Sequence, residues 1–212
     1  MLQIETLVFS PFQENTYVLW DETGDCAIVD PGCLEIREEQ RLVAFIEQHN
    51  LKPVKLINTH LHLDHVFGSA FVADKWGLEI WAHRDDEFMI PNTVNHARNF
   101  GVSMNDNPPP VNHYISDGDD VTFGNTTLKV IHVPGHSPGG VAFYHQQSAS
   151  LISGDILFRE SVGRSDLPGG NHEQLIAGIM QKLMTLPDNV KVYPGHGPTT
   201  TIGWEKSHNA YL

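Results

Sequence analysis

The chain has few cysteines, no long apolar run and little positive charge, and each shortage excludes a class of protein. Its two cysteines, Cys26 and Cys33, are too few for a secreted disulfide framework and too sparse for a cysteine-based metal site. No apolar stretch approaches the roughly 20 residues that span a bilayer. Residues 1–5 are not a basic segment leading into an apolar one, so we expect no signal peptide, no membrane partner and a cytoplasmic location.

The charge balance is strongly acidic. Thirteen Lys and Arg stand against 26 Asp and Glu, which gives a net charge of −13. Such a chain repels phosphate backbones, so we expect no nucleic-acid partner. Histidine, by contrast, occurs 13 times, as often as Lys and Arg together. The length of 212 residues suits a single domain over residues 1–212, and the pattern specifies no oligomeric state.

β-rich segments alternate with helices in both halves of the chain. We expect strands at 4–9, 17–20, 27–29, 54–58, 80–82, 121–123, 127–133, 141–144, 151–153 and 191–193, and helices at 35–49, 71–76, 173–184 and near 204. This order predicts an α/β fold of four layers, an αβ/βα sandwich with two sheets stacked between helices. Residues 84–112 interrupt it as a long excursion, which is typical of a lid or binding loop.

Three histidines and a carboxylate lie close together directly after the predicted strand at 54–58. They are His60, His62, Asp64 and His65, and four ligand-type residues in this spacing are unlike scattered surface histidines. Neutral imidazole and carboxylate groups bind divalent Zn, Fe or Mn ions. The cluster therefore predicts a metal site at the exit of this strand.

Three later segments repeat the arrangement of a ligand-type residue after a strand. His136 and His196 each follow a Pro-Gly pair, and Asp155 follows Gly154. Glycine and proline allow the sharp turns that hold such side chains at the rim of a sheet. We expect all three to meet the first cluster at one edge of the sheets.

With these residues in this order, the chain resembles the metallo-β-lactamase fold superfamily over essentially its whole length. The resemblance implies two divalent metal ions, zinc in the first place and iron or manganese as alternatives. It implies that one triad holds one ion (His60, His62, His136), a second triad holds the other (Asp64, His65, His196), and Asp155 bridges them together with a water or hydroxide. It also implies a catalytic role for Asp64, which would orient the metal-bound hydroxide or accept a proton from it.

The charge of such a centre indicates the kind of substrate. Two divalent ions and two aspartates leave a net charge of about +2 while the histidines are neutral. This positive pocket in an acidic protein favours a small anionic substrate, whose carbonyl group it would polarise.

Within the superfamily, the chain is most similar to short bacterial glyoxalase-II-like hydrolases, which cleave thioesters such as S-lactoylglutathione. The similarity rests on the sequence segment at residues 161–170, soon after Asp155, and on the short tail after His196. Asp155 argues against β-lactamases, which generally lack it. Two alternatives stay open: a mononuclear iron persulfide dioxygenase, and a lactone or phosphodiester hydrolase using the same metal centre.

Other notable residues are expected to have supporting or unrelated roles. Arg164 and Asp166 are predicted to brace their loop as an ion pair, and Cys33 to be a buried thiol. Thr59 and Asp30 are candidates for orienting the ligand histidines by hydrogen bonds. The remaining histidines are predicted to be surface or hydrogen-bonded residues, with His172 the one closest to a motif (His83, His96, His113, His132, His145, His172, His208).

Overall fold

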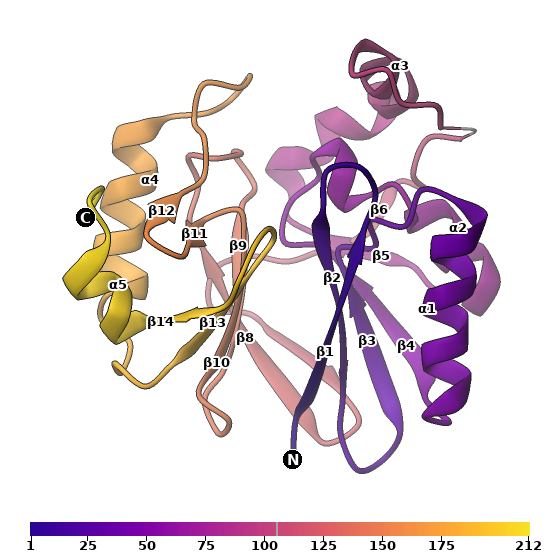
Figure 1. The fold of residues 1–212 in the computed structure, drawn as a ribbon, viewed down its shortest axis with the longest axis horizontal. Helices are drawn as coiled ribbons and strands as arrows, with labels where there is room; N and C mark the ends of the chain where they lie inside the picture. Colours follow the sequence, from indigo (N-terminus) through magenta and orange to yellow (C-terminus); the bar gives the residue numbers. More distant parts are fainter. Residues whose placement is uncertain (105) are drawn as a thin grey trace.

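Two six-stranded sheets pack face to face in this computed structural model, with helices on both outer faces (Figure 1). The structure describes residues 1–104 and 106–212. This architecture is the predicted four-layer αβ/βα sandwich, and the prediction is confirmed.

The first sheet has the strand order β1-β2-β3-β4-β5-β6. Its first three strands form antiparallel pairs, and the pairs from β3 to β6 are parallel. Parallel neighbours need crossover connections, which α1 and α2 provide on the outer face. The bounds are β1 Gln3–Phe9, β2 Glu14–Trp20, β3 Asp25–Val29, α1 Ile36–Gln48, β4 Lys52–Ile57, α2 Ser69–Trp76, β5 Ile80–Ala82 and β6 Val111–Tyr114.

The second sheet has the order β14-β13-β10-β9-β8-β7, with only the β10–β13 pair parallel. Helices α4 and α5 cover its outer face, and a small hairpin, β11–β12, lies beside it (Figure 1). The bounds are β7 Asp120–Phe123, β8 Thr126–His132, β9 Val141–His145, β10 Ser150–Gly154, β11 Leu157–Phe158, β12 Ser161–Val162, α4 His172–Gly178, β13 Lys191–Pro194, β14 Thr200–Thr201 and α5 Ile202–His208.

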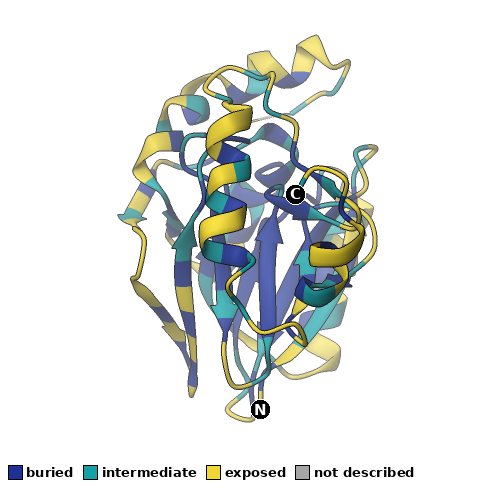
Figure 2. Cartoon of the chain, turned by 90° about the vertical axis from the view of Figure 1, so that its left-hand side faces the viewer, coloured by how far each residue is buried: buried dark blue, intermediate teal, exposed yellow. Residues whose placement is uncertain are grey.

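Three apolar layers hold the sandwich together, one between the two sheets and one beneath the helices on each side. In Figure 2, buried strands lie behind helices that are exposed on their outer faces. The middle layer packs fully buried side chains from both sheets, such as Tyr17 and Leu19 against Phe143. Removing apolar area from water is the main stabilising effect here, at roughly 25 cal/mol per Å².

The excursion contains a 3-10 helix, η2 (Arg84–Asn92), followed by α3 (Thr93–Asn99). It ends earlier than predicted, because Val111 begins β6, an edge strand that pairs only with β5. The predicted helix at 173–184 is α4 followed by a π-helical turn, η3 (Ile179–Leu183). Asn105, within the predicted excursion, lies outside the described residues.

Over the described residues, the helices are all too short or too polar to cross a bilayer.

Candidate metal centre

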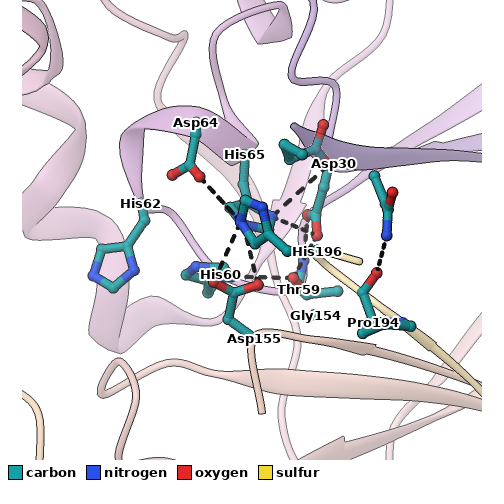
Figure 3. Close-up of polar contacts among 12 residues, drawn as sticks. Asp30, Thr59, His60, His62, Asp64, His65, Gly154, Asp155, Pro194 and His196 are labelled. Carbon is teal, nitrogen blue, oxygen red and sulfur yellow. Dashed lines mark hydrogen bonds and ion pairs between the residues drawn. The ribbon is translucent and has the colours of Figure 1, made fainter. Parts of the chain in front are cut away.

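All seven predicted ligand-type residues meet at one rim of the two sheets. His60 and His62 follow β4, and Asp64 and His65 lie on a short 3-10 turn, η1 (Leu63–His65). The other three enter from the second sheet, after β8, β10 and β13 (His136, Asp155, His196). Strand ends from both sheets therefore supply one centre, as expected from the sequence (Figure 3).

The three histidines His60, His62 and His136 form the first triad. His136 Nε2 lies 2.8 Å from His62 Nδ1 and 3.2 Å from His60 Nε2. Three imidazole nitrogens at this spacing match the ligands of one small divalent ion, whose Zn–N bonds are about 2.0–2.1 Å.

Asp64, His65 and His196 form the second triad. His196 Nε2 lies 3.2 Å from Asp64 Oδ2, and His65 Nε2 lies 3.9 Å from the same oxygen. His65 is fully buried, whereas His196 and Asp64 are partly open to solvent. The second triad thus has a mixed nitrogen and oxygen ligand set.

Asp155 lies between the two triads. Its Oδ1 is 3.4 Å from His65 Nε2, and its Oδ2 is 3.6 Å from both His136 Nε2 and His196 Nε2. The carboxylate therefore faces members of both triads, which is the position that a bridging ligand needs (Figure 3).

Hydrogen bonds at Nδ1 turn four of the five histidines so that Nε2 faces the centre. His65 Nδ1 donates to Asp30 Oδ2 at 3.1 Å, and His60 Nδ1 to Thr59 Oγ1 at 3.1 Å. His136 and His196 use backbone carbonyl groups, Arg164 O at 2.7 Å and Phe12 O at 3.1 Å. Such outer partners fix the tautomer of ligand histidines in metal sites.

Asp30 is the anchor of this outer shell. Its carboxylate accepts from the Thr59 hydroxyl at 2.5 Å and the Thr59 N–H at 2.7 Å, besides His65. Its backbone adopts the left-handed region with φ of 48°, a conformation costing about 1–3 kcal/mol that surrounding structure must hold. The predicted orienting roles of Asp30 and Thr59 agree with these contacts.

Glycine is required where the last ligand loop passes the centre. A Cβ on Gly195 would lie 2.1 Å from Asp155 Oδ1 and 2.7 Å from His65 Cε1. No real side chain fits there, so the Pro-Gly pair before His196 serves close approach as well as a turn.

The electrostatics of the two triads differ. Burial, followed by repulsion from neighbouring histidines, lowers the pKa of His60 well below its ordinary value and that of His62 to about 3. Both imidazoles are therefore neutral, with lone pairs free to bind a cation. Burial also opposes protonation of His65, but Asp155 and Asp64 outweigh it and raise its pKa well above the ordinary value. The second triad thus attracts positive charge.

The donor set fits a pair of divalent ions. His65 Nε2 and Asp155 Oδ1 are buried and have no hydrogen-bond partner, although both face the centre. Unpaired buried polar atoms cost about 1–3 kcal/mol each, so a cation between them would remove a penalty. The His/Asp clusters are consistent with a binuclear metal site.

A cavity of about 430 Å³ opens onto this centre. Metal-site residues form its floor, and its walls are apolar side chains such as Phe12, Phe158 and Leu167. Of the Lys and Arg in the described chain, Arg164 alone lines it. The cavity can hold a small molecule with an apolar part while a polar group rests on the metal-site floor.

The excursion contributes to the wall of this cavity through Phe100. This ring packs edge-on against Phe12 with 6.1 Å between centroids. Other apolar side chains of the excursion lie elsewhere: Met104 packs beside Leu63 and Phe67, Met89 packs into the core under the first sheet, and Phe88 is exposed. A covering function of the excursion stays a prediction.

Replacing Phe100 with alanine is expected to raise KM about 2- to 12-fold while metal content stays unchanged. Phe100 borders the space that substrate would fill, and an aromatic or apolar contact of its ring with substrate worth about 0.5–1.5 kcal/mol corresponds to this change in KM. Steady-state kinetics with elemental analysis would measure both. Phe88→Ala is the matched control, because Phe88 is equally exposed on the same segment but lies outside the cavity wall. Equal kinetics in both variants would contradict a substrate contact.

Two polar residues at this rim were not singled out from the sequence. Asn15 Nδ2 donates to Pro194 O and Gly197 O, both at 2.9 Å, and so holds the loop that carries His196. Glu14 is fully buried behind His65, where it accepts from the Thr16 hydroxyl at 2.7 Å. In the sequence, they appear only as a polar Glu-Asn pair at the start of a buried strand. Their roles depend on tertiary contacts that the sequence does not show.

The secondary candidates lie where they were expected. Arg164 and Asp166 form a two-bond ion pair at 2.8 Å on the surface. His172 contacts Ser165 Oγ at 3.3 Å, away from the centre. His83 and His132 stack at 4.1 Å near Asp85, and His132 Nε2 already bonds Pro138 O at 2.9 Å.

Both cysteines are expected to be unreactive in the folded protein. Burial raises the pKa of Cys26 to about 12 and that of Cys33 further, and only the thiolate is a nucleophile. A thiol reagent should therefore modify neither residue until denaturant is added, and then both. Cys33→Ser should leave kcat and KM nearly intact. Rapid modification of the native protein with loss of activity would contradict this.

Comparison with known proteins agrees with this geometry. A model of the metallo-beta-lactamase superfamily matches residues 9–196. Hydroxyacylglutathione hydrolase GloC of Haemophilus influenzae is 34% identical over 212 residues, covering 100% of this chain and 98% of that protein.

Two solved structures are similar over nearly the full length of both chains. The BLEG-1 B3 metallo-beta-lactamase has a TM-score of 0.90 and 35% identity, covering 99% of each chain. TTHA1623, in a di-iron-bound form, has a TM-score of 0.88 and 37% identity, covering 98% of this chain and 100% of that one.

Proposed function

This chain belongs to the metallo-beta-lactamase superfamily, and from that membership and its His/Asp centre we propose that it is a binuclear metal-dependent hydrolase that cleaves a thioester, such as S-lactoylglutathione or another acyl-glutathione. The observation that carries the proposal is the Asp155 carboxylate, which faces both triads at the floor of the cavity. Full-length similarity to GloC supports the choice of a thioester.

The metal ions would be held by the two triads and Asp155, with zinc as the first choice and iron or manganese as alternatives. Divalent ions there would supply Lewis acidity, which makes water a nucleophile near neutral pH and polarises a carbonyl group. Iron has support from the di-iron-bound form of the similar TTHA1623.

The side chains of this chain divide the remaining work. Asp64 lines the cavity beside His196, where it would steer or accept a proton from the attacking water. The apolar walls would hold the acyl group and exclude bulk water. A thiolate leaves readily at neutral pH, so no dedicated acid is required opposite Asp64. The positive centre favours a small anionic thioester as the substrate.

The decisive experiment combines metal analysis with a substrate panel. The protein, purified without added metal, is expected to contain two metal ions per chain and to release free thiol from S-lactoylglutathione. A lactone, a phosphodiester and a glutathione persulfide should react much more slowly. One iron per chain with oxygen consumption on the persulfide, and no thioester hydrolysis, would overturn the proposal in favour of a dioxygenase.

β-Lactam hydrolysis is a second candidate, because the similar BLEG-1 structure is that of a B3 metallo-beta-lactamase. Asp155 speaks against this activity, because β-lactamases generally lack it, but full-length similarity at 35% identity makes the activity a candidate again. A chromogenic cephalosporin belongs in the same panel. Turnover of that compound exceeding turnover of every thioester would make this the better assignment.

A further inference from the structure

Asp86 is a fully buried carboxylate outside the proposed ligand set. It lies on η2, four residues after the end of β5, at the base of the excursion. Burial raises its pKa, and a carboxyl group with no exposed surface needs hydrogen-bond donors around it. The identity of those donors indicates what the residue does.

Three donors surround this carboxylate, and all come from the two segments that carry the first triad. Asp86 Oδ2 accepts from the Leu61 N–H at 3.2 Å and the Ser137 hydroxyl at 2.8 Å. Its Oδ1 accepts from the Gly139 N–H at 2.6 Å. Leu61 stands between His60 and His62, and Ser137 directly follows His136. One carboxylate thus joins β4's exit loop to the loop after β8.

The approach between these segments is unusually close. A Cβ on Gly139 would lie 2.7 Å from Asp86 Cγ and 2.9 Å from its Oδ1, so only glycine allows the contact. Ser137 is itself fully buried. The two ligand segments are therefore closely packed against the Asp86 carboxylate.

The second triad is anchored elsewhere. His65 bonds Asp30, and His196 bonds Phe12 O. Among the hydrogen bonds of the described residues, none joins Asp86 to Asp64, His65 or His196. A change at Asp86 should therefore affect the two triads unequally.

We infer that Asp86 is a positioning residue that holds the His60–His62 loop against the His136 loop and thereby sets the metal affinity of the first triad alone. The inference rests on the proposed metal sites. Loss of an outer hydrogen-bond partner typically weakens metal binding 10- to 100-fold, and Asp86 supports all three ligands of its triad through the backbone and Ser137.

Asp86→Asn is the sharpest variant, because it keeps the shape and removes the charge. An amide offers one oxygen to three donors, and its NH₂ group must face at least one N–H or hydroxyl that also donates. Asp85→Asn is the matched control, because Asp85 is the exposed neighbour on the same helix.

The two sites can be measured separately in protein whose other site is disabled. In a His196→Gln background, chelator-competition titration with Zn²⁺ reports the first triad. In a His62→Gln background it reports the second. Adding Asp86→Asn is expected to weaken zinc binding about 10- to 100-fold in the first background and less than about threefold in the second. In metal-free protein, Asp86→Asn should also accelerate amide hydrogen exchange at Leu61 and Gly139 relative to the same protein with Asp86.

Unchanged affinity in the first background would overturn the inference, and so would an equal loss in both, which would mean a general structural role. If Asp86→Asn does not fold, Ser137→Ala decides, since it removes one donor and should weaken only the first triad, by a smaller factor. If neither background binds a zinc ion, the proposed metal sites fail instead, a result distinguishable from failure of the role of Asp86.

Discussion

Asp155→Ala is expected to lower metal content and activity together, with activity falling by more than about 100-fold. Asp155 is the one predicted ligand whose oxygens face both triads, at 3.4 Å from His65 and 3.6 Å from His136 and His196. Removing an outer partner of a metal ligand alone costs 10- to 100-fold, so loss of a shared ligand should cost more. Elemental analysis and thioester kinetics on the same preparation measure both effects.

The matched control is Asp188→Ala, which removes an exposed carboxylate that pairs with Lys206. An exposed pair of this kind contributes at most about 1 kcal/mol to stability, so metal content and activity should match the unmodified protein. Full metal occupancy in Asp155→Ala would contradict the assignment of Asp155 as the shared ligand.

Asp64→Asn should lower kcat about 10²- to 10⁴-fold and change KM by less than about threefold, which is the range expected for loss of a proton acceptor. Asp64 lines the cavity, with its Oδ2 3.2 Å from His196 Nε2. Burial opposes its charged form, but His65 and the hydrogen bond from His196 keep its pKa below the usual value, so the group is ionised and able to accept a proton. The amide keeps an oxygen and the shape but loses that ability.

The measurement is steady-state kinetics at saturating metal, with metal content determined in parallel so that lost occupancy is not mistaken for lost turnover. A raised KM with unchanged kcat would assign Asp64 to substrate binding. Trapping a covalent acyl-enzyme on any side chain, Cys33 included, would contradict direct attack by water.

The secondary structure was predictable wherever the local pattern was strong. The helix expected at 35–49 is α1, whose first turn has a capping box between Glu35 and Glu38 and whose buried face includes Leu42 and Ile46. The missed strands were β6, β11, β12 and β14, and the missed helix was α3. β6 follows three consecutive prolines and pairs with a single neighbour at the sheet edge, so its own residues provide little of the signal.

The residues of the candidate metal centre could likewise be named from the sequence, but the roles of similar residues around it could not be told apart. Phe88 and Phe100 are both exposed aromatic residues of the excursion, and only Phe100 reaches the cavity wall. Asp85 and Asp86 are adjacent carboxylates, and only Asp86 is buried among donors from the ligand loops. Neither difference is visible in the neighbouring residues, because each depends on which distant segment packs against the side chain.

By itself, the sequence determined the fold class and the residue types of the centre, since strand periodicity, Pro-Gly turns and a dense His/Asp cluster are local properties. Only the tertiary structure decided which nitrogen of each histidine faces inward. That orientation comes from partners far away in the chain, such as Phe12 O for His196 and Asp30 for His65. Hydrogen bonds across 184 and 35 residues form only once both sheets have packed, so no local pattern could specify them.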